Sequence, residues 1–254
     1  MTDMVLNIVL GLLTSAIGAG TGWAVQFGRR RRRLDRLRTF FGMPGGSDCL
    51  LVINRHVSST HGQSVHRNDV GALMELAVLV NSCGARPEII SHDQSHEGLG
   101  EKAEFCLGGP NSNERTAAHL LWRLPGVSFQ YTPGTWGSIT VGDQEYHGEP
   151  TSKTSPGWSY ALLARLDPGD GRRPTFLIGG QAAIGNLAAV RYLVRRQREL
   201  MRRHGARGNF VLMLRVINPA RYGPDEVELV ADVTAAATTP APAATSQSPA
   251  ALAP

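Results

Sequence analysis

The chain begins with an uncharged, largely apolar stretch. Residues 4–28 contain no Asp, Glu, Lys or Arg, and five arginines follow at positions 29–33. At about 1.5 Å per residue, such a helix spans a hydrocarbon core of about 30 Å. Positive charge beside a membrane span stays in the cytoplasm. We therefore expect a single-pass transmembrane helix at 4–28 in the cell inner membrane, an external segment at 1–3 and a cytoplasmic C-terminal domain.

Two further features of this region suggest partners. Small residues recur on one face of the expected span and would let two copies pair as a homodimer: Gly11, Ser15, Gly18 and Gly22. The basic juxtamembrane segment and linker, residues 29–47, alternates arginines with Leu34, Leu37, Phe40 and Phe41. This spacing predicts a short amphipathic helix on the lipid bilayer, and the alternative is a linker helix that docks on the domain. The expected membrane-surface residues are Arg29, Arg30, Arg31, Arg32, Arg33, Arg36 and Arg38.

Beyond a glycine-rich break at residues 42–47, apolar runs of strand length alternate with helical patterns. The strands are expected at 49–54, 87–91, 103–107, 158–166, 175–178, 210–217 and 227–233, and the helices at 68–83, 113–124 and 185–204. Gly142 and Asp143 predict the two-residue turn of a β-hairpin. Residues 48–233 are therefore expected to form a Rossmann-like layered α/β domain with a mostly parallel sheet and an inserted antiparallel hairpin. Residues 234–254, rich in Ala, Thr, Pro and Ser, predict a disordered tail.

Composition narrows the class of protein. The chain has 254 residues, 42% of them hydrophobic, which suffices for a core, and three cysteines are too few for a disulfide scaffold. The net charge of +5 lies entirely within the first 40 residues, so the domain is neutral and no nucleic acid partner is expected. All but two of the 26 basic residues are arginine. Together with abundant Ala, Gly and Pro, this bias suggests a bacterial genome rich in G and C.

Two similar segments carry a double glycine directly after a strand. Residues 105–109 (FCLGG) and 176–180 (FLIGG) are 71 positions apart, and each precedes a helix. Glycine lets a ligand approach the backbone, and a helix N-terminus attracts anions, so the two turns predict a site for a nucleotide or phosphate ligand. The alternative is that the glycines only make tight connections. The expected walls of the site are Gly108, Gly109, Asn111, Ser112 and Asn113 on one side and Gly179, Gly180, Gly185 and Asn186 on the other.

Polar loops follow the first two strands of the domain. His56, His61 and His66 lie in the first loop, and His92, Asp93, His96 and Glu97 lie in the second. We expect His56, His92 and Asp93 to contribute to the site, because imidazole and carboxylate groups bind ligands and transfer protons near neutral pH. Their spacing matches no metal motif, so no metal is expected. The phosphate-binding and dinucleotide-binding glycine motifs and the Gly-x-Ser-x-Gly elbow are absent from the sequence, and no cofactor is expected.

These patterns predict a membrane-anchored bacterial signalling protein whose cytoplasmic α/β domain binds or senses a small anionic ligand. Two alternatives stay open. One is a membrane-tethered enzyme acting on nucleotide or phosphorylated substrates, with Asn113, Glu114 and either Asp93 or His92 at its site. The other is an interaction scaffold without a small ligand, in which the glycine turns are purely structural.

Overall fold

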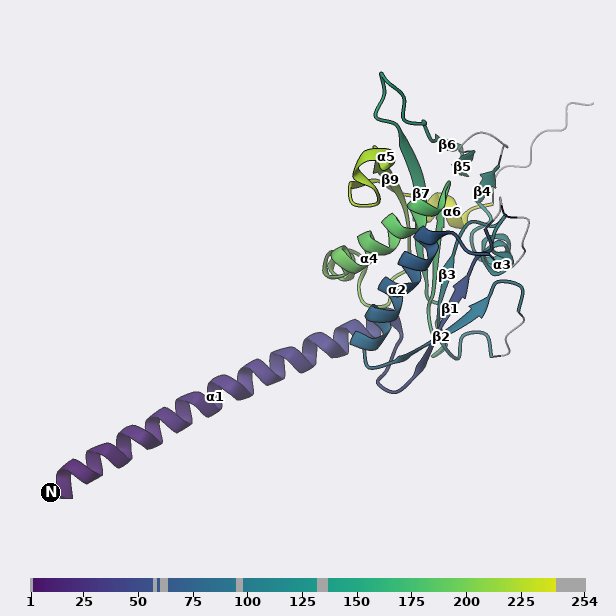
Figure 1. Ribbon diagram of the computed structural model, residues 1–254. Coiled ribbons are helices and arrows are strands. Elements are labelled where there is room, and N and C mark those ends of the chain that lie inside the picture. Colours follow the sequence, from purple (N-terminus) through teal and green to yellow (C-terminus); the bar gives the residue numbers. More distant parts are fainter. Residues whose placement is uncertain (1, 57–58, 60–63, 95–97, 132–136, 241–254) are drawn as a thin grey trace, which may run out of the picture.

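A long N-terminal helix leads into a layered α/β domain (Figure 1). The computed structural model describes residues 2–56, 59, 64–94, 98–131 and 137–240, without the side chains of residues 2, 3, 5–9 and 11–22. The helices are α1 (Thr2–Phe41), α2 (Arg67–Ser82), α3 (Glu114–Arg123), α4 (Ala183–His204), α5 (Pro219–Tyr222) and α6 (Thr234–Thr238). The strands are β1 (Asp48–Ile53), β2 (Arg86–Ser91), β3 (Ala103–Leu107), β4 (Val127–Gln130), β5 (Ser138–Val141), β6 (Gln144–His147), β7 (Trp158–Leu166), β8 (Thr175–Gly180), β9 (Phe210–Ile217) and β10 (Val227–Asp232).

The main sheet has seven strands in the order β10-β9-β7-β8-β3-β1-β2. Strands β2, β1, β3 and β8 pair in parallel, whereas β7 pairs antiparallel with both β8 and β9, and β10 antiparallel with β9. The sheet is therefore mixed, which corrects the expectation of a mostly parallel one. The physical reason is the connection between β7 and β8: it is a short turn, and a parallel pairing needs a long crossover.

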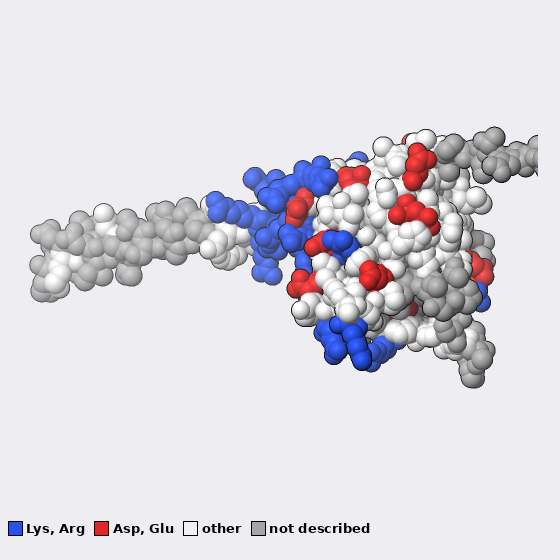
Figure 2. Space-filling view, turned by 90° about the horizontal axis from the view of Figure 1, so that it is seen from above, with Lys and Arg blue, Asp and Glu red and all other residues white. Residues whose placement is uncertain are grey.

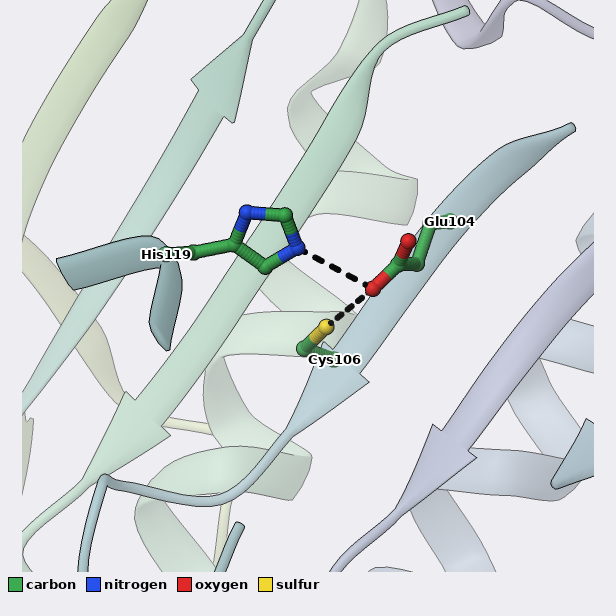
Figure 3. A group of neighbouring side chains, drawn as sticks. All are labelled: Glu104, Cys106 and His119. Atoms are coloured by element: carbon green, nitrogen blue, oxygen red, sulfur yellow. Dashed lines mark hydrogen bonds and ion pairs between the residues drawn. The ribbon is translucent and has the colours of Figure 1, made fainter. Parts of the chain in front are cut away.

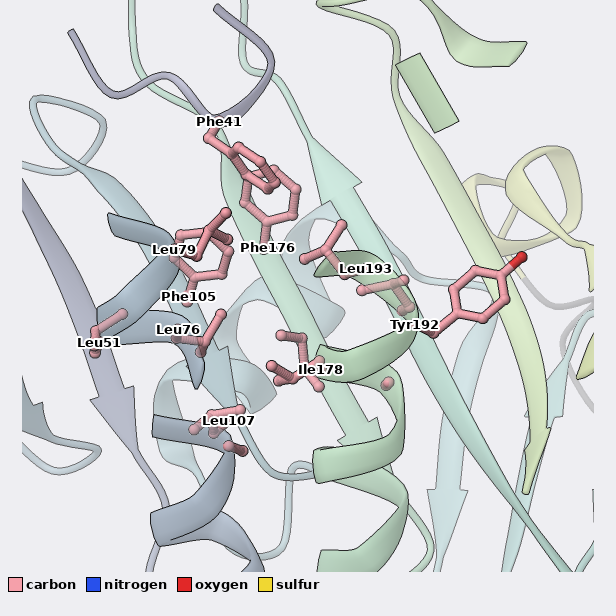
Figure 4. Packing of buried hydrophobic residues seen from close by; sticks show 14 of the residues in the cluster. Phe41, Leu51, Leu76, Leu79, Phe105, Leu107, Phe176, Ile178, Tyr192 and Leu193 are labelled. Carbon is pink, nitrogen blue, oxygen red and sulfur yellow. The ribbon is translucent and has the colours of Figure 1, made fainter. Parts of the chain in front are cut away.

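Helices α2 and α4 cover one face of this sheet, and α3, α6 and a second sheet cover the other (Figure 1). On the first face Phe105 and Phe176 stack, with ring centroids 4.7 Å apart, between the sheet and the aliphatic residues of α2 and α4 (Figure 4). The second sheet has the order β4-β5-β6, and its antiparallel β5–β6 pair is the predicted hairpin. The result is a three-layer domain with a core on each face of the main sheet.

Helix α1 does not match the predicted membrane span. Over residues 2–56, 59, 64–94, 98–131 and 137–240, no helix combines the length and the hydrophobicity that a bilayer crossing requires. Asn7, Thr14, Thr21, Gln26 and several glycines dilute the apolar residues of the segment. The predictions of a single-pass transmembrane helix, of an inner-membrane location and of a membrane-anchored sensor are therefore wrong. The expected pairing face, Gly11, Ser15, Gly18 and Gly22, lies outside the described side chains.

The C-terminal end of α1 belongs to the domain core. The helix runs unbroken through the arginine segment and ends at Phe41, and Gly42 follows with φ +66°, a conformation that glycine adopts readily. Phe40 and Phe41 are fully buried against Phe176. The buried end of α1 thus matches the alternative, a helix that docks on the domain. The contact of Arg29, Arg30, Arg31, Arg32, Arg33, Arg36 and Arg38 with a lipid surface stays a prediction. Basic side chains gather where α1 meets the domain (Figure 2).

The segment after β10 also differs from expectation. Thr234–Thr238 form helix α6, and Ala237 is fully buried on the face that carries α3. The first residues of the predicted disordered tail therefore pack on the domain, and residues 241–254 lie outside the described residues.

Candidate ligand-binding site

A pocket of about 380 Å³ lies at the carboxyl ends of β1, β3 and β8. From β1 the chain crosses to β2 on one side, and from β3 it continues to β8 on the other side. The carboxyl ends of β1 and β3 therefore flank the point where the strand order reverses, and ligands of open α/β sheets usually bind at this point. The lining comes from the loops after these strands, from the starts of α2 and α4, and from β4 of the second sheet.

A buried carboxylate forms part of this pocket. Asp69, in the first turn of α2, is only 1% exposed. Asn54 directly after β1 donates from Nδ2 to its Oδ2 at 3.0 Å, and Asn186 of α4 donates from Nδ2 to its Oδ1 at 2.7 Å. Asn186 also accepts a 2.7 Å hydrogen bond from the backbone N–H of Gly180. Four elements of the fold are thus tied together by one carboxylate and two amides.

Burial sets the electrostatics of Asp69. Desolvation raises the pKa of this carboxyl above its ordinary value, against the lowering effect of the hydrogen bonds from Asn186 and Asn54. His66 and His56, whose rings stack with centroids 5.3 Å apart, also act to lower the pKa. The positive end of the α2 dipole adds a favourable position for the negative charge. The pocket therefore holds a carboxylate where an anion was expected to bind.

Two polar atoms of the pocket residues are buried without a hydrogen-bond partner among the described residues. They are Oδ1 of Asn54, a residue only 6% exposed, and Nδ1 of His56. A buried acceptor without a donor costs about 1 to 3 kcal/mol, so most such groups in proteins have a partner. Because both residues line the pocket, a ligand in it can supply the missing partners.

The two double-glycine turns lie side by side beneath Phe129 of β4. A Cβ on Gly179 would lie 3.4 Å from the Cα of Gly109 and 3.2 Å from the Phe129 ring. A Cβ on Gly180 would lie 2.9 Å from the Cα of Gly185, where α4 begins. The glycines are therefore needed for close packing of strand, helix and aromatic ring. This is the role that the structural alternative assigned to them.

The predicted site residues separate into two groups. Those that line the pocket are Gly109, Asn111, Ser112, Gly180, Asn186 and His56. Those outside its lining are Gly108, Asn113, Gly179, Gly185, His92 and Asp93. Asn113 is fully buried and caps α3, accepting from the N–H of Thr116 at 3.0 Å and donating to the carbonyl of Leu107 at 2.6 Å. His61, His96 and Glu97 lie outside the described residues.

Sequence reasoning missed three parts of the pocket. Asn54 falls at the end of a predicted strand and Asp69 at the start of a predicted helix, neither of them as a site residue, and Phe129 lies on a strand that was not predicted. The N-cap of α2 is His66, whose Nδ1 accepts from the N–H of Asn68 at 3.1 Å. A polar residue directly after a buried strand, as at Asn54, is the one signal that could have been used.

A second polar cluster lies under α3, away from the pocket (Figure 3). Glu104 and Cys106 of β3 and His119 of α3 bring potential metal ligands within 4.8 Å of one another. The Glu104 carboxylate, however, accepts from both Nε and Nη2 of Arg115 at 2.7 and 2.9 Å, from His119 at 3.2 Å and from the Cys106 thiol at 3.0 Å. A guanidinium on both carboxylate oxygens opposes a metal cation, so these residues do not fit one.

The charges of this cluster follow from its burial and pairing. Burial alone would raise the pKa of Glu104, but the hydrogen bonds from Arg115, His119 and Cys106 outweigh it and lower the pKa to about 2. Burial, then the neighbouring Glu104 charge, raises the pKa of the Cys106 thiol well above its ordinary value. A protonated thiol is a poor metal ligand and a poor nucleophile. The cluster is thus a closed ion pair inside the core.

The geometry also bears on the alternative of an enzyme. Asn113 is a helix cap, Glu114 is exposed and outside the pocket lining, and Asp93 and His92 lie away from it, so the proposed catalytic set does not assemble. Comparisons of the chain with protein-family models, with curated proteins and with solved structures found no match.

Proposed function

We propose that the domain is a binding module for a small, uncharged molecule with neighbouring hydroxyl groups, such as a sugar or polyol, held in the pocket at the carboxyl ends of β1, β3 and β8. The observation that carries the proposal is the buried Oδ1 of Asn54, which has no donor among the described residues although it lines the pocket. A ligand hydroxyl would supply that donor.

The surroundings of Asn54 favour hydroxyl groups over an anion. Asp69 uses one acceptor position on each oxygen for an amide, and a carboxylate has about four such positions. The amides and the carboxylate thus present acceptors in excess, which suit donors. A phosphate or carboxylate ligand would instead meet the charge of Asp69 at short range, with repulsion strengthened by burial.

The opposite side of the pocket is aromatic. Phe129 covers both glycine turns, and Tyr131, half exposed, follows it along the chain. Aromatic rings bury the C–H face of a ligand while its hydroxyl groups bond the polar side. The start of α4, which no side chain caps among the described residues, adds backbone N–H donors.

Thermal unfolding and calorimetry of the full chain with D-ribose, D-glucose and myo-inositol test this proposal, with inorganic phosphate as the anionic contrast. A ligand at about 100 times its Kd should raise Tm by about 5 to 10 °C. Asn54→Ala should weaken its binding at least about tenfold, because a buried hydrogen bond is lost.

Asn81→Ala, at an exposed position of α2, is the matched control and should leave the Kd unchanged. The proposal is abandoned if none of the three polyols raises Tm, or if the Asn54 and Asn81 variants bind equally well. Stabilisation by phosphate alone would also contradict it.

A further inference from the structure

A second cavity, of about 600 Å³, lies at the opposite end of the sheet from the proposed ligand site. Its lining comes from the end of α1, from the loop that precedes β8, and from Arg207 before β9. These segments meet at the amino ends of the parallel strands. The cavity is therefore separate from the pocket described above, and its lining differs in kind, because half of its lining residues are charged.

Four arginines line this cavity: Arg38, Arg172, Arg173 and Arg207. Among the described residues, the guanidinium groups of Arg173 and Arg207 have no carboxylate within 4.0 Å. Arg172 has only a 3.6 Å contact with Asp170, whose side chain is 85% exposed. Arg38 lies 3.9 Å from Asp35 and donates from Nε to the carbonyl of Cys83 at 2.7 Å.

The remaining carboxylate of the lining is already neutralised from within the domain. Asp167 accepts from Nη2 of the buried Arg165 at 3.1 Å and from the N–H of Gly169 at 3.0 Å. Its charge is thus directed to Arg165 and not to the arginines of the cavity. Taken together, the lining carries more positive charge than its acidic side chains compensate.

The excess of positive charge lowers the pKa values of neighbouring arginines. Burial lowers the pKa of Arg165, and Arg207 contributes to the lowering against the effect of Asp167. Burial and then Arg172 lower the pKa of Arg123. Like charges that are not neutralised have this effect on one another. The exposed arginines at 29–33 and Arg36 surround the approach along α1, where the basic side chains gather (Figure 2).

We propose that this cavity binds an anion that carries at least two phosphate charges. The guanidinium group offers paired N–H donors that match two oxygens of a phosphate, and several of them together favour a multiply charged ligand over a single carboxylate. The surrounding arginines would raise the local concentration of such an anion. The phosphate can come from a small soluble molecule or from a lipid headgroup, and the chemistry of recognition is the same.

Titration of the full chain with inorganic pyrophosphate by calorimetry, at about 0.1 M salt, tests the proposal. We expect saturable binding of one pyrophosphate, weakened at least about tenfold in the double variant R173Q/R207Q, because charge-assisted hydrogen bonds are lost. The matched control R215Q/R221Q removes the same charge at the other end of the domain and should bind as the wild type does.

Co-sedimentation with vesicles then identifies the source of the phosphate. Vesicles of phosphatidylcholine with cardiolipin, whose headgroup carries two phosphates, serve as the probe. Vesicles that bind the wild type, release it on addition of pyrophosphate and fail to bind R173Q/R207Q would indicate a lipid headgroup. Binding of pyrophosphate without binding of vesicles would indicate a soluble ligand. Absence of saturable pyrophosphate binding, or an equal loss in the two double variants, would overturn the proposal.

Discussion

Nε of Arg165 donates a 2.9 Å hydrogen bond to the carbonyl oxygen of Phe40, a residue 125 positions earlier in the chain. Arg165 is fully buried, stacks its guanidinium 5.4 Å from the centroid of the Phe40 ring, and also donates to the carbonyls of Gly208 and Ala206. One side chain of β7 thus fastens the last turn of α1 to the domain.

Replacement of this arginine should be among the most destabilising changes in the chain. Arg165→Met removes the donor to one buried carbonyl, to two partly buried carbonyls and to Oδ2 of Asp167, and breaking a buried pair in this way costs about 3 to 5 kcal/mol of unfolding free energy. Urea unfolding measures the loss. Arg86→Met, which breaks the exposed pair with Asp48, is the control and should cost less than about 1 kcal/mol. Equal effects of the two changes would contradict the role of Arg165.

The buried Glu104 should make stability depend on acid. Its pKa of about 2 in the folded state lies below the ordinary 4.5, so its contribution is complete above about pH 4.5 and disappears as pH falls toward 2. The loss is on the order of 3 kcal/mol. Urea unfolding between pH 2 and 6 measures it. Glu104→Gln should lack this part of the pH dependence, whereas Glu114→Gln, at an exposed position, should keep it.

Asp69 should show the opposite sign. Burial raises its pKa in the folded state above the ordinary 3.8, so the folded state binds the proton more tightly than the unfolded state. Its contribution to stability is therefore greatest at low pH and is lost as pH rises through the folded-state pKa. As pH falls from about 6 to about 4, the unfolding free energy of the wild type should increase relative to that of Asp69→Asn. If the variant instead gained stability relative to the wild type over this range, the pKa of Asp69 would not be raised in the folded state.

Two glycines with positive φ allow the cost of backbone strain to be measured apart from the cost of steric overlap. Gly108 has φ +92°, and a Cβ there would lie 2.6 Å from the Cβ of Asn54, whereas Gly46 has φ +79° and nothing within 4 Å. Gly46→Ala should cost about 1 to 2 kcal/mol from backbone strain alone. Gly108→Ala should cost about 1 to 3 kcal/mol more from overpacking. Chemical denaturation measures both, and equal costs would mean that the loop at Asn54 moves freely.

The strands that could be predicted are those whose own side chains are buried. Residues 103–107, 158–166 and 210–217 are mostly apolar runs interrupted only by Glu104, by Ser159 and Arg165, and by Arg215, and the structure has strands with the same bounds. The four residues of β4, VSFQ, are too few and too mixed to stand out, although their Phe129 covers the glycine turns. The direction of β7 was recoverable in principle, because no helical pattern separates it from β8.

The pocket was harder to predict than the fold because its contacts are long-range. Asn54, Asp69 and Asn186 meet although 15 and 117 positions separate Asp69 from its two amide partners, and no local spacing encodes such a meeting. The prediction of a membrane span at 4–28 failed for a different reason. The segment has the length and the lack of charge of a membrane span, but its glycines and its hydroxyl and amide side chains leave it less apolar than a bilayer crossing requires.

The continuity of α1 has a mechanical consequence. Forty residues at about 1.5 Å each make a rod of about 60 Å, of which the last turn is embedded in the domain. A sideways load on the free part acts with a long lever arm on the Phe40–Arg165 contact. Arg165 lies on β7, and at the other end of that strand the N–H of Tyr160 bonds Gln181 of the proposed ligand site at 2.8 Å. The rod and the pocket therefore bear on opposite ends of the same strand.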